Sequence, residues 1–113
     1  MLQHHPTISE TRDRFDWDIP QAYNIGVDIC DKHAAATPDA CAIIDIDPDG
    51  TATEYTFRQL QSVSNQLAHV LSESCAPGDR VAVLLPQCFE TAVAHIAIAK
   101  MGCIALPLFT LFG

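Results

Sequence analysis

The chain has 113 residues, enough for one small domain, and 49% of them are hydrophobic, as is usual in globular proteins. Its 14 acidic and 6 basic residues give a formal net charge of −8 at pH 7, and the acidic residues are concentrated in the first half of the chain. This half would repel phosphate backbones, and no basic patch is present, so the composition excludes nucleic acid as a partner.

Residues 1–20 are polar and follow no helical or strand period, so they predict an irregular N-terminal arm. Phe15, Trp17 and Ile19 alternate within it, which indicates a short extended piece laid against a core. The arm lacks the apolar stretch of a secretory signal. The five cysteines are odd in number and form no Cys-x-x-Cys pair, which predicts reduced thiols and a cytoplasmic location. Residues 21–113 are expected to form one α/β unit.

A first helix is expected to begin at Asn24, whose side chain can cap it, and to end at the segment TPD. Ile25, Ile29, Cys30 and His33 would share one face of this helix. Cys30 and His33 are one turn apart and could hold zinc, but a structural site needs four ligands and no second pair has matching spacing. The preferred interpretation is a core cysteine beside a partly buried histidine.

A β-hairpin is predicted for the segment CAIIDIDPDGTATEYTF, in which two β-rich runs flank Asp-Pro-Asp-Gly. Asp45, Asp47, Asp49 and Gly50 match the spacing of the first ligands and the glycine of a calcium-binding EF-hand loop. That loop also needs a bidentate glutamate at its end, where this chain has Thr56, and the flanking residues are strand-like. We therefore expect a solvated hairpin tip with Gly50 at positive φ.

A second helix is predicted from the capping box formed by Thr56 and Gln59. Its apolar residues fall three or four apart on one face: Leu60, Val63, Leu67, Val70 and Leu71. Downstream we expect a buried strand in RVAVLLP, a helix in CFETAVAHIAIAKMG that ends at Gly102, and a second buried strand in CIALPLF. These three elements predict one parallel βαβ unit.

Two parallel strands make an incomplete sheet, because parallel strands are normally covered on both faces and have neighbours at their edges. The chain is therefore expected to be a truncated part of a larger α/β domain. Polar residues interrupt its apolar second half, so no run approaches the roughly 20 residues that cross a bilayer. We expect no membrane span.

No complete active site and no metal site is visible in the sequence. Glycine-rich phosphate loops and a Gly-x-Ser-x-Gly turn are absent. Glu90 and His95 are five residues apart in the predicted helix, so they do not face each other. Glu90 is expected to be a first-turn acid that complements the helix dipole, and His95 a packing or interface residue. His4 and His5 are expected to be an exposed pair.

The sequence from Trp17 to Gly113 resembles the N-terminal part of AMP-forming acyl-CoA synthetases, the acid–CoA ligases of the adenylate-forming, AMP-binding superfamily. The matching pieces are, in order, WDIPQAYNIGVDICDKHA, YTFRQL with SNQLAHVL, GDRVAVLLPQ, ETAVAHIAIAKMG and PLFTLFG. The first piece is similar to the acetyl- to medium-chain branch of that family. The resemblance implies the N-terminal part of its large domain: helix, hairpin, helix and one parallel βαβ unit.

Members of this family activate a carboxylic acid with ATP and magnesium to an acyl-adenylate and then pass the acyl group to CoA. The resemblance implies this activity, within fatty acid metabolism, for a parent enzyme in which the rest of the synthetase chain is the partner of this segment. The family's phosphate loop ending in Lys, its aromatic-Thr-Glu segment, its ribose-binding Asp and its mobile Lys are absent here. The segment alone is therefore expected to be inactive and to bind no cofactor.

Phe109 and Thr110 follow the second parallel strand, where the backbone of acetyl-type relatives lies along the CoA nucleotide. Because ligands gather at the carboxyl ends of strands, these are the candidate CoA-binding residues, although the glycines common there in acetyl-type enzymes are missing. A plain core aromatic at Phe109 is the preferred interpretation. For the whole chain, the alternative hypothesis is a non-catalytic binding or interaction module that uses the exposed apolar edge of its βαβ unit.

Overall fold

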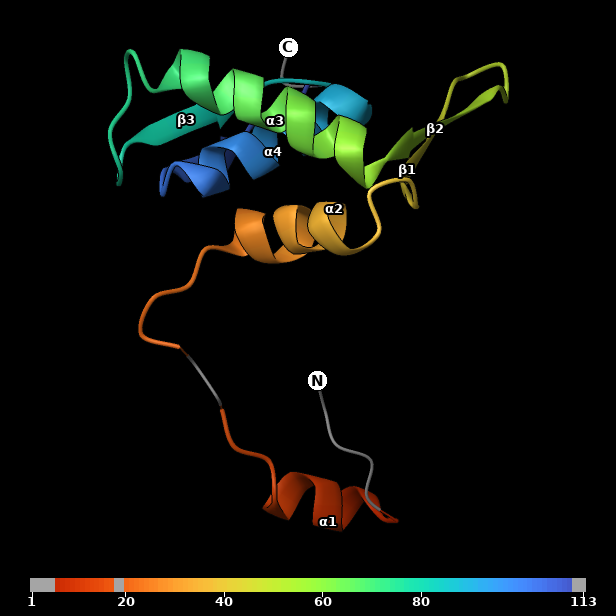
Figure 1. Cartoon of the computed structure of the whole chain (residues 1–113), viewed down its shortest axis with the longest axis vertical. Helices are drawn as coiled ribbons and strands as arrows, with labels where there is room; N and C mark the ends of the chain where they lie inside the picture. The colour runs from red at the N-terminus through yellow and green to blue at the C-terminus, as the bar shows by residue number, and fades with distance from the viewer. Residues whose placement is uncertain (1–5, 18–19, 111–113) are drawn as a thin grey trace.

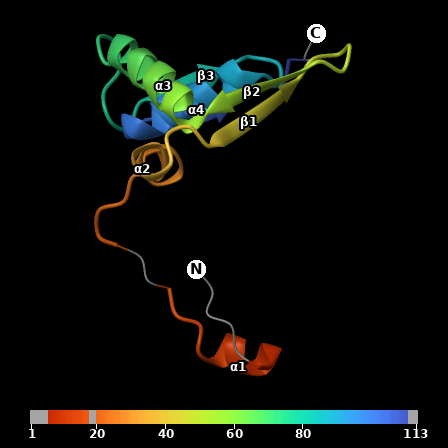
Figure 2. The ribbon, with the colours of Figure 1, turned by 45° about the vertical axis from the view of Figure 1, so that its right-hand side comes forward.

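The computed structural model describes residues 6–17 and 20–110. A short helix near the start of the chain lies apart from the other elements (Figures 1 and 2). This helix is α1 (Ile8–Asp13). The Cα radius of gyration is 17.2 Å, whereas a compact chain of this length has about 13 Å. Residues 6–17 therefore extend away from the core region, residues 24–110.

The prediction of an irregular arm is wrong at α1, because Thr7 starts a helix there. The Thr7 hydroxyl accepts a hydrogen bond from the Glu10 amide at 3.2 Å and donates one to the Glu10 carboxylate at 3.0 Å. Phe15 and Trp17 meet edge to face with ring centroids 4.9 Å apart. Their exposed fractions are 46% and 75%, so neither is laid against the core as predicted. Ile19, His4 and His5 lie outside the described residues.

The next helical segment consists of a π-helical stretch, η1 (Val27–Asp31), followed by α2 (Lys32–Ala36). Asn24 caps it as predicted, because its Oδ1 accepts from the Val27 amide at 3.2 Å. The predicted shared face is wrong: Ile25 and Ile29 are about half exposed while Cys30 is fully buried. The wider π turn changes the angle between successive residues, so a 3.6-residue period does not describe this face.

The predicted hairpin is confirmed as β1 (Cys41–Ile46) paired antiparallel with β2 (Ala52–Thr56). At its tip the Asp47 amide donates to the Thr51 carbonyl at 2.9 Å, and Gly50 has a φ of 88°. A positive φ is easily reached by glycine, which explains the residue at this position.

Helix α3 (Phe57–Leu71) begins at Thr56 with both bonds of the predicted capping box. Its buried face differs from the prediction, because Ser64 lies at its centre beside Leu60. Val63 and Val70 are displaced to the flanks and are 39% and 61% exposed. The buried serine is tolerated because its hydroxyl donates to the Gln61 carbonyl at 3.1 Å.

The predicted parallel βαβ unit is also confirmed. Its elements are β3 (Arg80–Val83), α4 (Phe89–Lys100) and β4 (Ile104–Pro107), with β3 and β4 paired in parallel. Gly102 ends α4 with a φ of 69°. The strands are not buried as predicted, because helices cover one face of this two-stranded sheet and side chains alternate between its faces. Val83 is 5% exposed, whereas Ile104 and Leu106 are about half exposed.

The core is built around α4, which packs against α3 and against the parallel strands β3 and β4 (Figures 1 and 2). One cluster joins α4 to η1, α3 and the hairpin: Cys30, Leu60, Phe89, Val93 and Ile96. A second joins its other side to the parallel strands: Val83, Ala94 and Ile98. Tyr55 of β2 stacks on Phe89 with ring centroids 3.8 Å apart. The fold is the α/β arrangement with an incomplete sheet that the sequence predicted.

Candidate functional site

The carboxyl ends of β3 and β4 form one edge, called the carboxyl edge here, and the candidate CoA residues leave β4 at this edge. The Leu108 amide donates to the Val83 carbonyl at 2.9 Å, which joins the exit of β4 to the end of β3. Phe109 is 59% exposed and Thr110 is also exposed. Within the described residues, Phe109 is therefore not covered by core side chains.

The amino end of α4 lies at the same edge, and a carboxylate from the hairpin already caps it. The amide of Phe89 donates to Asp45 Oδ2 at 3.0 Å, and the side chain of the N-cap residue Cys88 caps none of the helix amides. The amino ends of helices commonly bind phosphate through their free amides. Here Asp45 occupies that position, so the start of α4 is a structural junction.

The role of Asp45 was missed in the sequence, where it was interpreted as part of the hairpin tip. The alternation with Ile44 and Ile46 pointed the other way, because it would place the isoleucines on the inward face, whereas in the structure they are exposed and Asp45 is half-buried. A charged residue on an inward face needs a partner.

The tip of the hairpin is stabilised by Asp49. Its carboxylate accepts a hydrogen bond from the Thr51 amide at 2.8 Å, and that bond lowers the pKa of Asp49.

A second polar cluster surrounds Lys100 at the other end of α4. The lysine side chain is 8% exposed, and its Nζ lies 2.7 Å from Asp31 Oδ1. It also donates to Asn65 Oδ1 at 2.7 Å and to Ser64 Oγ at 3.0 Å. A lysine has three donors, and these bonds use them all. Lys100 is therefore a structural cation and is not available to a phosphate group.

Hydrogen bonds also join the end of α4 to the segment before η1. Asn24 Nδ2 donates to the carbonyls of Ala99 and Lys100, both at 3.0 Å. A Cβ atom added at Gly26 would lie 2.9 Å from the Ile96 carbonyl oxygen, so this backbone approaches α4 closely. Asn24 thus caps two helices at once, of which the sequence predicted one.

The structure does not bring the proposed zinc pair together as a site. Cys30 is fully buried, and burial raises the pKa of its thiol. His33 is exposed rather than partly buried, and its ring stacks on Phe57 with centroids 4.9 Å apart. All five cysteines are free. Within residues 6–17 and 20–110, no three His, Cys, Asp or Glu side chains gather closely enough to hold a metal ion.

Glu90 lies in the first turn of α4 as predicted, and His95 is half-buried on the same helix. In the described part of the chain, no helix is long and apolar enough to cross a membrane. The described residues thus supply a scaffold and one exposed edge at the strand ends.

The family model for AMP-binding enzymes matches residues 30–113 of this chain. The chain belongs to this family. The resemblance noted in its sequence is thereby confirmed.

Relatives among AMP-binding enzymes match nearly the whole chain. The human mitochondrial acyl-coenzyme A synthetase ACSM3 is 29% identical over 112 residues, which cover 93% of this chain and 19% of that protein. Acetyl-coenzyme A synthetase 2 of Zygosaccharomyces bailii is 36% identical over 99 residues, which cover 86% of this chain and 15% of that protein. The chain thus spans about a fifth or less of the length of these relatives.

Solved structures agree with the family assignment. The acyl-CoA synthetase of Brucella canis has a TM-score of 0.84 and 28% identity, covering 94% of this chain and 21% of that one. The fatty acyl CoA synthetase of Mycobacterium tuberculosis has a TM-score of 0.66 and 30% identity, covering 80% of this chain and 17% of that one. The adenylate-forming fold predicted from the sequence is confirmed by these likenesses.

Proposed function

We propose that this chain is the N-terminal segment of an AMP-forming acid–CoA ligase. The parent enzyme activates a carboxylic acid with ATP to an acyl-adenylate, releases pyrophosphate and transfers the acyl group to the thiol of CoA. The observation that carries the proposal is the family match over residues 30–113. In addition, the relatives are much longer proteins, and the match to this chain covers about a fifth of their length.

The segment contributes scaffold rather than reacting groups. Adenylate formation needs cations and backbone amides held against the triphosphate in a dry, preorganised site. In this chain Lys100 is bound by Asp31, Lys32 is paired with Asp28, and Asp45 caps α4. These residues therefore do not fit a magnesium–ATP site. The groups that bind ATP and magnesium come from the rest of the synthetase chain.

The carboxyl edge is the place where this segment contacts a substrate, and we assign Phe109 and Thr110 to CoA. Their exposure and their position after β4 support this assignment. In the complete gene product, Phe109→Ala is expected to raise the KM for CoA and leave the KM for ATP unchanged. Leu106→Ala, which lies within β4 and is half exposed, serves as the control. Equal changes in both KM values would contradict the assignment.

The cytoplasmic location predicted from the cysteines is part of this proposal. The free thiols support it, while the human relative named above is mitochondrial. Fractionation of cells that produce the complete gene product decides between the two compartments.

A second candidate function, a non-catalytic interaction module, is favoured by the exposed apolar side chains of the parallel sheet. Ile104 and Leu106 of β4 are about half exposed, and Leu84 after β3 is 61% exposed. The coding sequence after Gly113 separates the two functions. A Ser/Thr/Gly-rich loop ending in Lys supports the ligase, because its amides and ammonium can hold phosphate. A coding sequence without such a loop supports the interaction module.

A further inference from the structure

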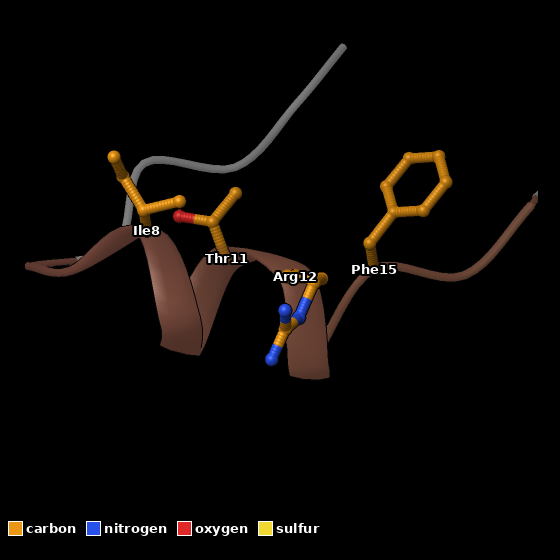
Figure 3. Close-up of a pocket in the computed structure, with 4 residues that line it drawn as sticks. All are labelled: Ile8, Thr11, Arg12 and Phe15. Carbon is orange, nitrogen blue, oxygen red and sulfur yellow. The ribbon is translucent and has the colours of Figure 1, made fainter.

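The α1 arm, residues 7–17, has one apolar face. Ile8 and Thr11 of α1 and Phe15, which follows the helix, point to the same side, whereas the guanidinium of Arg12 points away from them (Figure 3). Together they line an open hollow of about 360 Å³ (Figure 3). Ile8 is 90% exposed, and Trp17, which contacts Phe15, is 75% exposed. The face thus carries large apolar side chains that the described residues do not cover.

A helix of this kind needs a partner to persist. α1 has six residues and none of them is buried, and isolated helices shorter than about 12–15 residues are marginal in water. The Thr7 cap helps locally but does not bury apolar surface. Exposed apolar side chains that gather on one face indicate a contact surface.

We propose that the α1 arm is a docking element whose Ile8–Phe15 face packs into an apolar groove of the remaining synthetase chain. This inference rests on the proposed function, because that function supplies the partner. It adds that the first residues of the chain bind the synthetase at a distance from their own core region, in the way that an amphipathic helix binds a groove.

The likeness to the Brucella canis acyl-CoA synthetase favours this occupant. The match covers 94% of the chain, so it leaves out 6% of 113 residues, or about 7. Residues 7–17 are 11, so the match includes part of the arm. Its TM-score is 0.84 even though the arm extends far from the core region (Figure 1). Part of the arm is therefore included in the likeness to a chain that is much longer than the 21% of it that is matched, which favours the rest of a synthetase as the occupant.

The charge of the arm defines the chemistry of the groove. Ser9, Glu10 and Asp13 lie away from the apolar face of α1, and the Ser9 hydroxyl donates to the Asp13 carboxylate at 3.4 Å. The arm also carries Arg12 and Arg14, and Arg12 Nε lies 3.5 Å from Asp13 Oδ1, so a groove with an apolar floor and a rim of both charges would complement it. A second copy of the chain is a poorer occupant, because two chains that each carry a net charge of −8 repel each other.

Hydrogen–deuterium exchange of the complete gene product tests the proposal, with a synthetic peptide of residues 7–17 as the reference. If the arm is docked, amides of α1 exchange at least about tenfold more slowly in the protein than in the peptide. Ile8→Asp should bring the exchange close to the peptide rate, because it places a carboxylate in the apolar groove. Ser9→Asp is the matched control, and it should keep the slow exchange. Both new carboxylates lie in the first turn, where they favour the helix itself.

Exchange at the peptide rate in the wild type, or equal exchange in Ile8→Asp and Ser9→Asp, would overturn the proposal. Slow exchange that disappears on dilution would also overturn it, because a second copy would then be the occupant. Ligase activity is assayed on the same sample. Activity with a fast-exchanging arm refutes the docking alone, whereas slow exchange without activity refutes the proposed ligase function.

Discussion

Replacing Asp45 by alanine is predicted to destabilise the amino end of α4. The carboxylate accepts the first amide of α4 at 3.0 Å. Loss of a capping bond costs about 1 kcal/mol, and loss of a negative charge at a helix start costs about 0.5 kcal/mol more. The expected total is about 1.5 kcal/mol, which corresponds to roughly tenfold faster exchange of α4 amides. Asp45→Asn keeps an acceptor oxygen and should lose about 0.5 kcal/mol, the charge contribution alone.

The assay is hydrogen exchange of residues 93–100 in the complete gene product, because these amides report the opening of α4. Asp47→Ala is the control, since it removes a carboxylate from the same hairpin where no capping bond is made to α4. An effect of Asp45→Ala no larger than that of Asp47→Ala would refute the reasoning. A loss as large in Asp45→Asn as in Asp45→Ala would show that charge, and not the accepted bond, stabilises the junction.

Three further predictions concern other named contacts. Thr56→Ala should cost about 1 kcal/mol of unfolding free energy in a urea titration, and Ser62→Ala in the same helix should cost less. Lys100→Met should cost about 3 kcal/mol in the same assay, because it leaves Asp31 partly buried without its cation; adding Asp31→Asn should recover part of this loss. Hydrogen bonding to Lys32 lowers the pKa of Asp28 below its ordinary value of 3.8. This contribution is therefore present above pH 3.8 and is lost as the pH falls through the lower folded-state pKa, so the stability difference between the wild type and Asp28→Asn should shrink in acid.

Features with local causes could be predicted from the sequence. The capping box at Thr56 needs residues three apart, and the turns at Gly50 and Gly102 need one glycine each. The strand–helix–strand order of the βαβ unit follows from its apolar runs and their lengths, and the structure has it in parallel register.

Features that depend on tertiary contacts could not be predicted in the same way. The Asp45 cap joins residues 44 apart in the chain, and no local pattern identifies its partner. The buried face of α3 contains Ser64 rather than Val63, which was predicted there. Ser64 can be buried because its hydroxyl donates a hydrogen bond to the Gln61 carbonyl and accepts one from Lys100. A 3.6-residue period predicted Ile25 and Ile29 on the buried face of the first helix. They are about half exposed, because the π-helical stretch has a different number of residues per turn. At the candidate site, the position of Phe109 was predictable from strand order, whereas its exposure was not.

The central claim is that this chain is part of an acid–CoA ligase whose reacting groups lie outside these 113 residues. The most direct measurement is acid-dependent pyrophosphate release with ATP, magnesium and CoA, using a panel of short- to medium-chain carboxylic acids. We predict release by the complete gene product and none by a purified, monodisperse chain of residues 1–113. Release by residues 1–113 above a boiled control, or no release by the complete gene product with any acid of the panel, would contradict the account.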